Sequence, residues 1–247
     1  MLNLDDISKH FGGLAALNEV SLKVEEGEFL GLIGPNGSGK TTLFDVISGV
    51  LKPSSGRVSF MGEDITAFYP DKICHLGIAR TFQIPRPFKD LSVVENVSLG
   101  VLFGNAGQSA SYSEEAAKRD AFRYIDFVEL RVDELTMPNE LTAVGLRRLE
   151  LARALATKPT LLLADEVISG LNQEEISEAS SVLKRIKDEM GVTIIWVEHI
   201  MGALMSLVER VVVLDYGKII AEGKPSEVSK DKKVIEAYLG EEEPDVL

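Results

Sequence analysis

One glycine-rich stretch of this 247-residue chain has the composition and spacing of a phosphate-binding loop. Residues 34–41 read Gly-Pro-Asn-Gly-Ser-Gly-Lys-Thr and fit the pattern G-x-x-x-x-G-K-[ST]. Glycines let backbone N–H groups approach phosphate oxygens, the lysine can reach the β- and γ-phosphates, and the threonine hydroxyl can bind Mg²⁺. The residues expected to contact nucleotide are Gly34, Pro35, Asn36, Gly37, Ser38, Gly39, Lys40, Thr41 and Thr42. We expect Lys40 to act catalytically, from a solvated loop, by neutralising charge on the transferred phosphoryl group.

An acidic pair could complete the chemistry of such a loop. Asp165 and Glu166 follow the apolar run Leu161–Ala164. An acidic pair after a strand is more often a turn or a helix cap, but a phosphate loop in the same chain favours a catalytic interpretation. We expect Asp165 to bind Mg²⁺, directly or through water, and Glu166 to orient and polarise the attacking water.

His199 comes just after another apolar run, Val192–Val197. In isolation we would interpret it as a structural histidine. Ligands of parallel sheets, however, bind beyond the carboxyl ends of the strands. Gly34, Asp165 and His199 each lie just past a predicted strand, so three distant segments are expected to converge on one γ-phosphate.

The elements that must position these residues follow from the hydrophobic pattern. Strands are expected at 20–24, 29–33, 57–61, 78–82, 160–164, 192–197 and 210–214. Helices are expected at 40–48, 71–76, 93–103, 113–130, 146–156, 173–190 and 201–207. Alternating strands and helices predict an α/β fold with a parallel sheet covered on both faces. We expect one domain, with its core at about 1–82 and 158–240, a helical insertion at about 83–157 and an acidic tail at 241–247.

Composition excludes several classes of protein. The 26 basic and 39 acidic residues give a net charge of −13, which disfavours binding to nucleic acid or to anionic lipid. Cys74 is the only cysteine, so it has no disulfide partner within the chain, and a zinc site is poorly supported. The N-terminus does not have the pattern of a signal peptide, and the apolar runs are too short to span a membrane. We therefore expect a cytoplasmic protein.

Phe11 and Gln83 do not stand out on physical grounds, and their ordinary interpretations are a buried aromatic and a loop glutamine. Together with the phosphate loop, Asp165-Glu166 and His199, they make the whole chain resemble an ABC-type ATPase cassette. The segment 76–83, Leu-Gly-Ile-Ala-Arg-Thr-Phe-Gln, and the ending 234–240, Val-Ile-Glu-Ala-Tyr-Leu-Gly, resemble the ATP-binding subunits of branched-chain amino acid uptake systems.

The resemblance implies a P-loop NTPase fold with a parallel-sheet core, an N-terminal antiparallel β subdomain and an inserted α-helical subdomain. It also implies an ATPase that uses ATP and Mg²⁺. Phe11 would stack on adenine, His199 would contact the γ-phosphate, and Mg²⁺ would be bound by Thr41, Gln83 and Asp165. Gln83 would also contact the attacking water and report to a membrane permease, which would hold the chain at the inner face of the cell membrane.

The resemblance further implies that two cassettes, identical or different, enclose two ATP molecules. Each ATP would lie between one chain's phosphate loop and the other chain's signature segment. The signature here is Leu-Thr-Ala-Val-Gly, residues 141–145, because Arg147-Arg-Leu-Glu follows it. Thr142 and Gly145 are thus the expected nucleotide contacts of this segment. Four residues depart from the family pattern: Val144 replaces a glycine, Gly145 a glutamine, Val167 a proline and Asn172 an aspartate.

Four functions are compatible with the sequence. The leading one is the energy-coupling ATPase of an importer for branched-chain or other small amino acids and amides. The others are the ATPase of a lipopolysaccharide-export system, a soluble ABC protein of DNA repair or translation, and a P-loop kinase with Glu166 as the base. Gln83 and His199 disfavour the kinase, and the acidic single cassette disfavours the DNA-repair and translation proteins.

Overall fold

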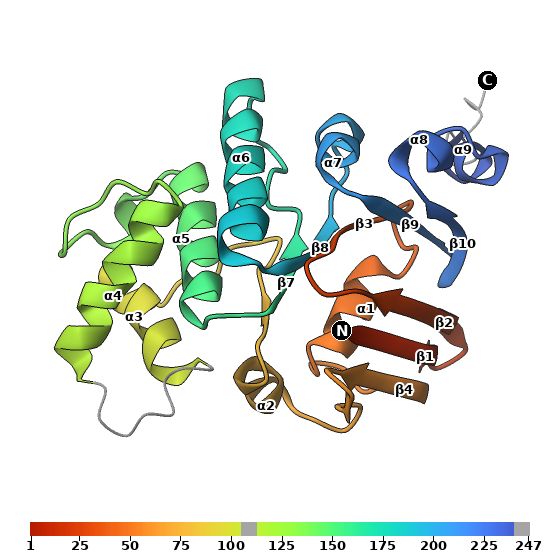
Figure 1. The fold of residues 1–247 in the computed structure, drawn as a ribbon, viewed down its shortest axis with the longest axis horizontal. Coiled ribbons are helices and arrows are strands. Elements are labelled where there is room, and N and C mark those ends of the chain that lie inside the picture. The colour runs from red at the N-terminus through yellow and green to blue at the C-terminus, as the bar shows by residue number, and fades with distance from the viewer. Residues whose placement is uncertain (105–112, 240–247) are drawn as a thin grey trace. The chain divides into compact units, whose positions relative to one another are not determined.

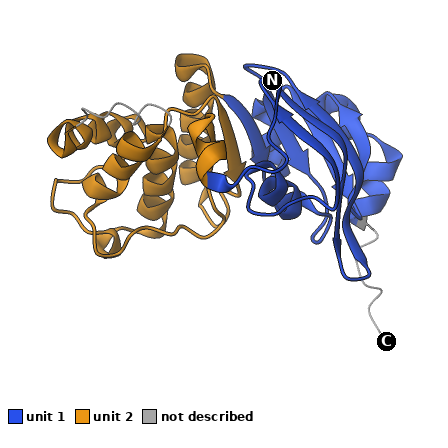
Figure 2. Cartoon of the chain, turned by 90° about the horizontal axis from the view of Figure 1, so that it is seen from below, with its two compact units in different colours: residues 1–70, 193–247 blue, residues 71–192 orange. Residues whose placement is uncertain are grey.

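The computed structural model describes residues 1–104 and 113–239 (Figure 1). The chain divides into two compact units (Figure 2). Unit 1 contains residues 1–70 and 193–247, and unit 2 contains residues 71–192. The helical insertion expected at 83–157 falls inside unit 2, together with the strand that ends at Asp165. The expected acidic tail, residues 241–247, lies outside the described residues.

Unit 1 contains an antiparallel sheet of four strands, in the order β2-β1-β4-β5. The strands are β1 (Leu2–Phe11), β2 (Leu14–Val24), β4 (Ser55–Phe60) and β5 (Glu63–Asp64). The strand expected at 20–24 is therefore the second half of β2. The pairing of β1 with β2 shifts register between Ile7 and Lys9, and Glu19 has a φ of +55°. This irregularity breaks the apolar–polar alternation, so the sequence pattern covers only the regular end of the strand.

Unit 1 also contains a second, mixed group of strands. β3 (Phe29–Ile33) pairs in parallel with both β8 (Thr193–Val197) and β9 (Arg210–Asp215), and β10 (Lys218–Gly223) pairs antiparallel with β9. Every residue of β3 and β8 is buried, as expected of parallel strands covered on both faces. The rings of Phe29 and Trp196 lie 5.8 Å apart in this core. The helices of unit 1 are α1 (Lys40–Ile47), α7 (Met201–Leu207), α8 (Pro225–Val228) and α9 (Lys232–Leu239).

Unit 2 combines a short parallel strand pair with a group of helices. β6 (Ile78–Arg80) pairs with β7 (Leu161–Asp165). The helices are α2 (Pro70–His75), which begins at the unit boundary, α3 (Val93–Phe103), α4 (Glu114–Phe127), α5 (Ala143–Ala156) and α6 (Gln173–Met190), and a 3₁₀ turn spans Pro138–Glu140. Helices α3, α4 and α5 pack against one another.

Local capping sets the helix ends in unit 2. Ser92 and Asn172 form capping boxes with Glu95 and Glu175, and Gly191 ends α6 in the left-handed conformation. Helix α5 begins at Ala143 rather than at the predicted Leu146, because the Thr142 hydroxyl accepts a hydrogen bond from the Gly145 N–H. The predicted strand 78–82 is shorter than expected and ends at Arg80.

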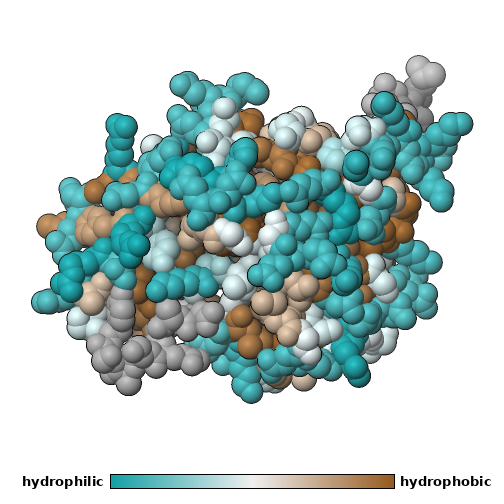
Figure 3. Space-filling model, viewed as in Figure 1, coloured by the Kyte–Doolittle hydropathy of each residue, from teal (hydrophilic) through white to brown (hydrophobic). Residues whose placement is uncertain are grey.

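The described part of the chain contains no helix long and apolar enough to cross a bilayer. On the face shown in Figure 3, hydrophilic residues cover most of the surface. That coverage agrees with the large number of charged residues in the sequence.

Candidate functional site

The glycine-rich loop lies in unit 1, between β3 and α1. The Lys40 side chain turns back into the loop, where its ammonium donates hydrogen bonds to the carbonyl oxygens of Gly34 and Pro35, at 2.7 and 2.8 Å. Lys40 is only 6% exposed, so the expectation that it lies in a solvated position is wrong. The loop folds around its own lysine, because the carbonyls provide hydrogen-bond acceptors for a buried ammonium group.

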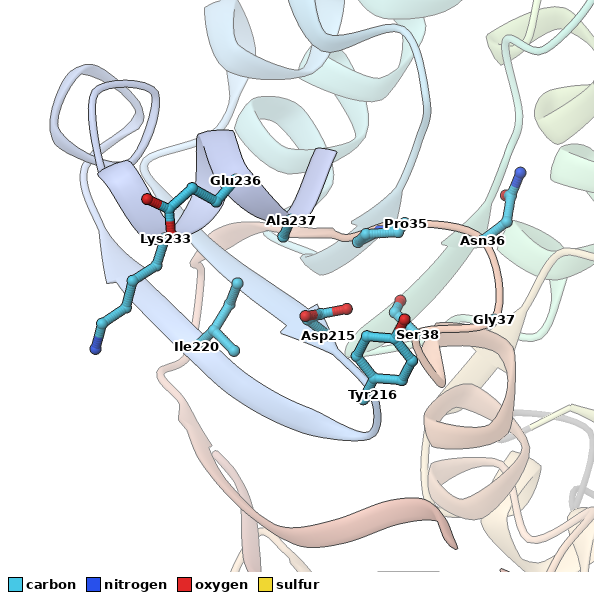
Figure 4. A pocket seen from close by; sticks show the side chains of 10 residues that line it. All are labelled: Pro35, Asn36, Gly37, Ser38, Asp215, Tyr216, Ile220, Lys233, Glu236 and Ala237. Atoms are coloured by element: carbon cyan, nitrogen blue, oxygen red, sulfur yellow. The ribbon is translucent and has the colours of Figure 1, made fainter. Parts of the chain in front are cut away.

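The loop is fastened to the end of β9. The Gly217 N–H donates to the Ser38 carbonyl at 2.9 Å, and the Gly34 Cα lies so close to the Leu214 carbonyl that a Cβ there would stand 2.0 Å from its oxygen. A pocket of about 450 Å³ adjoins this junction (Figure 4). Loop residues 35–38 line one side, and Asp215, Tyr216, Ile220 and three residues of α9 line the rest. The end of β9 and the turn that follows it thus hold the phosphate loop in place.

His199 lies at the same sheet edge as the glycine-rich loop. In the parallel pair of β3 and β8, Leu32 stands opposite Val197, so Gly34 and His199 each follow the carboxyl end of neighbouring strands. The His199 N–H donates to the carboxylate of Glu198 at 3.0 Å, and Glu198 is fully buried. The sequence interpretation did not identify Glu198, which fixes the backbone at this histidine.

Phe11 ends β1 in unit 1, directly before the turn to β2. Its side chain is 48% exposed, and the Lys9 ammonium lies 5.3 Å from its ring centroid. The interpretation of Phe11 as a buried aromatic therefore does not hold. A half-exposed ring next to a cation suits stacking against a flat aromatic ligand.

Asp165 and Glu166 lie in unit 2, at the end of β7. Asp165 is buried, its carboxylate pairs with the Arg80 guanidinium at 3.2 Å, and its N–H donates to the Thr81 hydroxyl. Arg80 and Thr81 belong to the segment that ends the neighbouring strand β6, and the sequence interpretation missed both. Their positions could be found only once β6 and β7 are known to pair.

Glu166 is joined directly to Gln83. The Gln83 amide nitrogen donates to a Glu166 carboxylate oxygen at 2.8 Å, although the two residues are 83 positions apart. Glu166 has a φ of +48°, which is uncommon for a residue other than glycine and typical of constrained functional positions. The Arg147 guanidinium of α5 holds the Glu166 carbonyl at 2.9 Å.

Thr142 and Gly145 lie at the start of α5, on an open groove of about 1070 Å³ within unit 2. Val144 lines the same groove. Five carboxylates and two guanidiniums also line it: Asp126, Glu129, Glu174, Glu175 and Glu178, with Arg131 and Arg148. Arg148 is engaged there, because it hydrogen-bonds the Glu129 carbonyl and pairs with Glu178. The surroundings of this helix start are therefore more acidic than basic.

Comparison with known proteins decides the family. Residues 17–169 match the protein family described as ABC transporter. The chain belongs to the ABC transporter family. Residues 218–244 match a second description, branched-chain amino acid ATP-binding cassette transporter. The resemblance found in the sequence is thus confirmed, and family membership implies ATP hydrolysis.

The similar proteins match over nearly the whole chain. The probable branched-chain amino acid transport ATP-binding protein LivG of Archaeoglobus fulgidus is 37% identical over 100% of this chain and 98% of its own. The high-affinity branched-chain amino acid transport ATP-binding protein BraF of Pseudomonas aeruginosa is 35% identical over 98% of both chains.

Solved structures of ABC cassettes share the fold. MJ1267, an ATP-binding cassette of an ABC transporter in its ADP conformation, is 34% identical with a TM-score of 0.87, over 98% of this chain and 99% of its own. A dimeric post-hydrolysis state of the cassette MJ0796, bound to ADP and Pi, is 28% identical with a TM-score of 0.83, over 91% and 99%. The predicted cassette fold, with an antiparallel β part and a helical part, is confirmed, and cassettes of this family bind nucleotide.

Proposed function

We propose that this chain is the ATP-hydrolysing subunit of a membrane importer for branched-chain amino acids or related small amino acids and amides. The observation that carries the proposal is the similarity over nearly the full length to branched-chain amino acid transport ATP-binding proteins. The match over residues 218–244 supports the same subgroup independently of the phosphate loop.

In unit 1, the glycine-rich loop binds the phosphates of ATP. The Lys40 ammonium already lies inside the loop and exchanges its two carbonyl partners for phosphate oxygens when nucleotide enters. Thr41 and Thr42 follow at the start of α1, whose N-terminal N–H groups favour an anion. Phe11 stacks on adenine, and His199, at the same sheet edge as the loop, contacts the γ-phosphate.

Mg²⁺ fits the donor chemistry of Thr41, Gln83 and Asp165, which offer hydroxyl, amide and carboxylate oxygens. Among the described residues, no group of three or more His, Cys, Asp or Glu side chains could hold a metal ion. An ion would therefore depend on the phosphates of the nucleotide as well, as is usual for Mg²⁺. Bound Mg²⁺ would neutralise charge on those phosphates.

Glu166 orients and polarises the attacking water, and Gln83 fixes the Glu166 carboxylate by the hydrogen bond between them. Asp165 keeps its place at the end of β7 through Arg80 and Thr81. Hydrogen bonds and an ion pair within the chain thus hold both carboxylates, as expected of a preorganised site.

Two cassettes act together, and the signature segment of each completes the site of the other. In this chain Val144 puts a branched side chain where the family has glycine, and the neighbouring groove is acidic. Both features disfavour a phosphate. We therefore propose an asymmetric pair with a different cassette, in which hydrolysis occurs chiefly at the Lys40 and Glu166 of this chain.

The asymmetry is tested with two heterodimers. Glu166→Gln should remove most ATP turnover, and the same change at the equivalent glutamate of the partner cassette should remove much less. Two equal losses, or full-rate hydrolysis by a dimer of this chain alone, would contradict the proposal.

Coupling to the permease runs through the loop around Gln83 and the following segment, Pro85–Asp90. Phe82, Ile84 and Phe88 are exposed apolar side chains, which is the surface a membrane partner needs. The backbone at Phe88 is held by two hydrogen bonds to the buried Asn96 side chain. The backbone at Phe88 is therefore held independently of the Phe88 side chain, whose ring lies 4.9 Å from the Arg153 guanidinium.

The experiment reconstitutes the chain in lipid with its permease and with the capture protein, that is, the protein that binds the solute and delivers it to the permease. We expect ATPase activity to rise when the capture protein carries a branched-chain amino acid. Phe88→Ala or Leu91→Ala should keep basal activity and lose this stimulation, whereas Leu135→Ala, at an exposed apolar residue elsewhere in unit 2, should keep both. Stimulation of the ATPase by lipopolysaccharide would contradict the proposed function and support a lipopolysaccharide-export system. Transfer of phosphate to a small hydroxyl compound would contradict it and support a kinase.

A further inference from the structure

The hydrogen bond between Gln83 and Glu166 joins two segments that arrive from different strands. Gln83 follows β6 by three residues, and Glu166 follows β7 directly. Neither strand fixes the side chains by itself. Besides the contacts of Asp165 with Arg80 and Thr81, one helix, α5, contacts both segments.

Glu150 of α5 holds the Gln83 end. Its Oε1 accepts a hydrogen bond of 2.8 Å from the Phe82 N–H, the peptide group directly before Gln83. Glu150 is 6% exposed, and its other oxygen, Oε2, has no hydrogen-bond partner among the described residues. A carboxyl group is costly to bury, so a contact that retains one needs a reason beyond packing.

Arg147 of α5 holds the Glu166 end. Its guanidinium donates to the Glu166 carbonyl at 2.9 Å. Arg147 and Glu150 are three residues apart, a spacing that places them on the same face of a helix. One rigid face of α5 therefore contacts the backbone next to Gln83 and the backbone of Glu166.

We propose that Arg147 and Glu150 are positioning residues that together set the hydrogen bond between Gln83 and Glu166. The inference rests on the proposed function, since the bond matters because Glu166 acts on water. Because α5 starts at the segment 141–145, a displacement of that segment along the helix moves both ends of the bond together. The helix thus links the signature segment to the catalytic glutamate of the same chain.

The ionisation of Glu150 adds a measurable property. Burial raises the pKa of its carboxyl group from 4.5 to about 7, against the Phe82 N–H and the positive charges of Arg153, Arg86 and Arg147. Because burial disfavours the ionised form, the folded chain should lose stability as the pH rises toward about 7 and unfolded chains release this proton first.

The first test is hydrogen exchange of the Phe82 amide in the nucleotide-free chain, which needs no ATPase activity. In Glu150→Leu, which keeps the volume and removes the acceptor, exchange should be faster by roughly tenfold or more. Glu150→Gln keeps an uncharged acceptor and should lie between the two. Melting curves record whether each variant folds.

The second test is steady-state ATP hydrolysis. Glu150→Leu and Arg147→Met should each lower kcat by roughly tenfold, with the KM for ATP changed by less than about threefold, because the phosphate loop is untouched. The double variant should lose little more than either single one, since both residues hold the same hydrogen bond. Arg185→Met is the control: it removes a hydrogen bond from an arginine to the Phe127 carbonyl, elsewhere in unit 2, and should keep kcat.

Fully additive losses in the double variant, or a Phe82 amide whose exchange is the same in wild type and Glu150→Leu, would overturn the inference. If Glu150→Leu does not fold, Glu150→Gln still decides: a Phe82 amide that exchanges at the wild-type rate in this variant rejects the role of Glu150. If wild type hydrolyses no ATP, the proposed function fails, whereas the exchange result stands on its own.

Discussion

Gly34 sits at the tightest backbone contact of the phosphate loop, and replacing it with alanine is the sharpest test of how that loop is built. Gly34 has a φ of +152°, and an added Cβ would lie 2.0 Å from the Leu214 carbonyl oxygen and 2.7 Å from the Ser38 hydroxyl. Leu214 belongs to β9, which is paired on both sides, by β3 and β10. The colliding oxygen is backbone and cannot move aside as a flexible side chain would.

Gly37 in the same loop provides a matched control. It has a φ of +75°, and an added Cβ would meet nothing within 4 Å. Gly37→Ala should therefore cost only the left-handed backbone penalty, about 1–2 kcal/mol. Gly34→Ala adds the displacement of packed backbone, about 1–3 kcal/mol, for a total of about 2–5 kcal/mol.

Thermal unfolding followed by circular dichroism measures both variants. At about 2–4 °C per kcal/mol for a chain of this size, Gly37→Ala should lower Tm by roughly 2–8 °C. Gly34→Ala should lower Tm by roughly 4–20 °C and, measured side by side, by more than Gly37→Ala. Equal shifts in the two variants would show that the contact with Leu214 does not constrain the loop. A Gly34→Ala protein as stable as wild type would refute the reasoning altogether.

Lys40→Ala should lose most ATPase activity in a phosphate-release assay. The buried Lys40 ammonium also donates hydrogen bonds to two carbonyls of the loop, so Tm should fall by the equivalent of about 1–3 kcal/mol. Glu166→Gln should bind Mg-ATP, hardly hydrolyse it, and accumulate as an ATP-bound dimer with a suitable cassette; size exclusion with ATP showing only monomer would contradict this. Glu150→Gln should gain stability over wild type as the pH rises from 4.5 to about 7, by up to about 3 kcal/mol. In that pH range the unfolded wild-type chain releases the Glu150 proton and the folded chain keeps it, so wild type is destabilised. Denaturant unfolding at pH 5 and pH 8 measures the difference in the free energy of unfolding.

The regular elements of the fold could be predicted because their patterns are local. Helices Val93–Phe103, Gln173–Met190 and Met201–Leu207 have the predicted ends. Two of them begin at a side chain that caps the helix, and α6 also ends at a glycine, so the signal lies within a few residues of each end. The buried strand β3 is likewise a continuous apolar run.

Other elements gave no local signal. β1 contains Asp6 with a φ of +50° and shifts register twice before Lys9, so its apolar residues do not alternate regularly. β10 is only partly buried along its length and is defined by its pairing with β9. Strands of this kind are specified by their neighbours rather than by their own sequence.

The same distinction separates the site residues. The phosphate loop could be predicted because one short segment holds all of its chemistry. Arg80 and Glu150 could not, because each acts through a partner 85 or 68 positions away. In a single sequence, nothing distinguishes a buried helix glutamate that holds a distant peptide group from a glutamate on a solvated helix face.

The position of Thr142 in the structure allows two interpretations of its hydroxyl group, as a phosphate contact and as a helix cap. As a hydroxyl residue in the signature segment, it could be interpreted as a phosphate contact, yet its side chain already caps α5 through the Gly145 N–H. A capping role would retain Thr142 whether or not a partner's nucleotide binds there. Val144 lines the acidic groove and also a small apolar pocket, together with Leu151 and Val167. Its side chain therefore lies beside α5 and the segment after Glu166. The change from glycine to valine thus favours a helix start that positions its neighbours rather than one that binds phosphate.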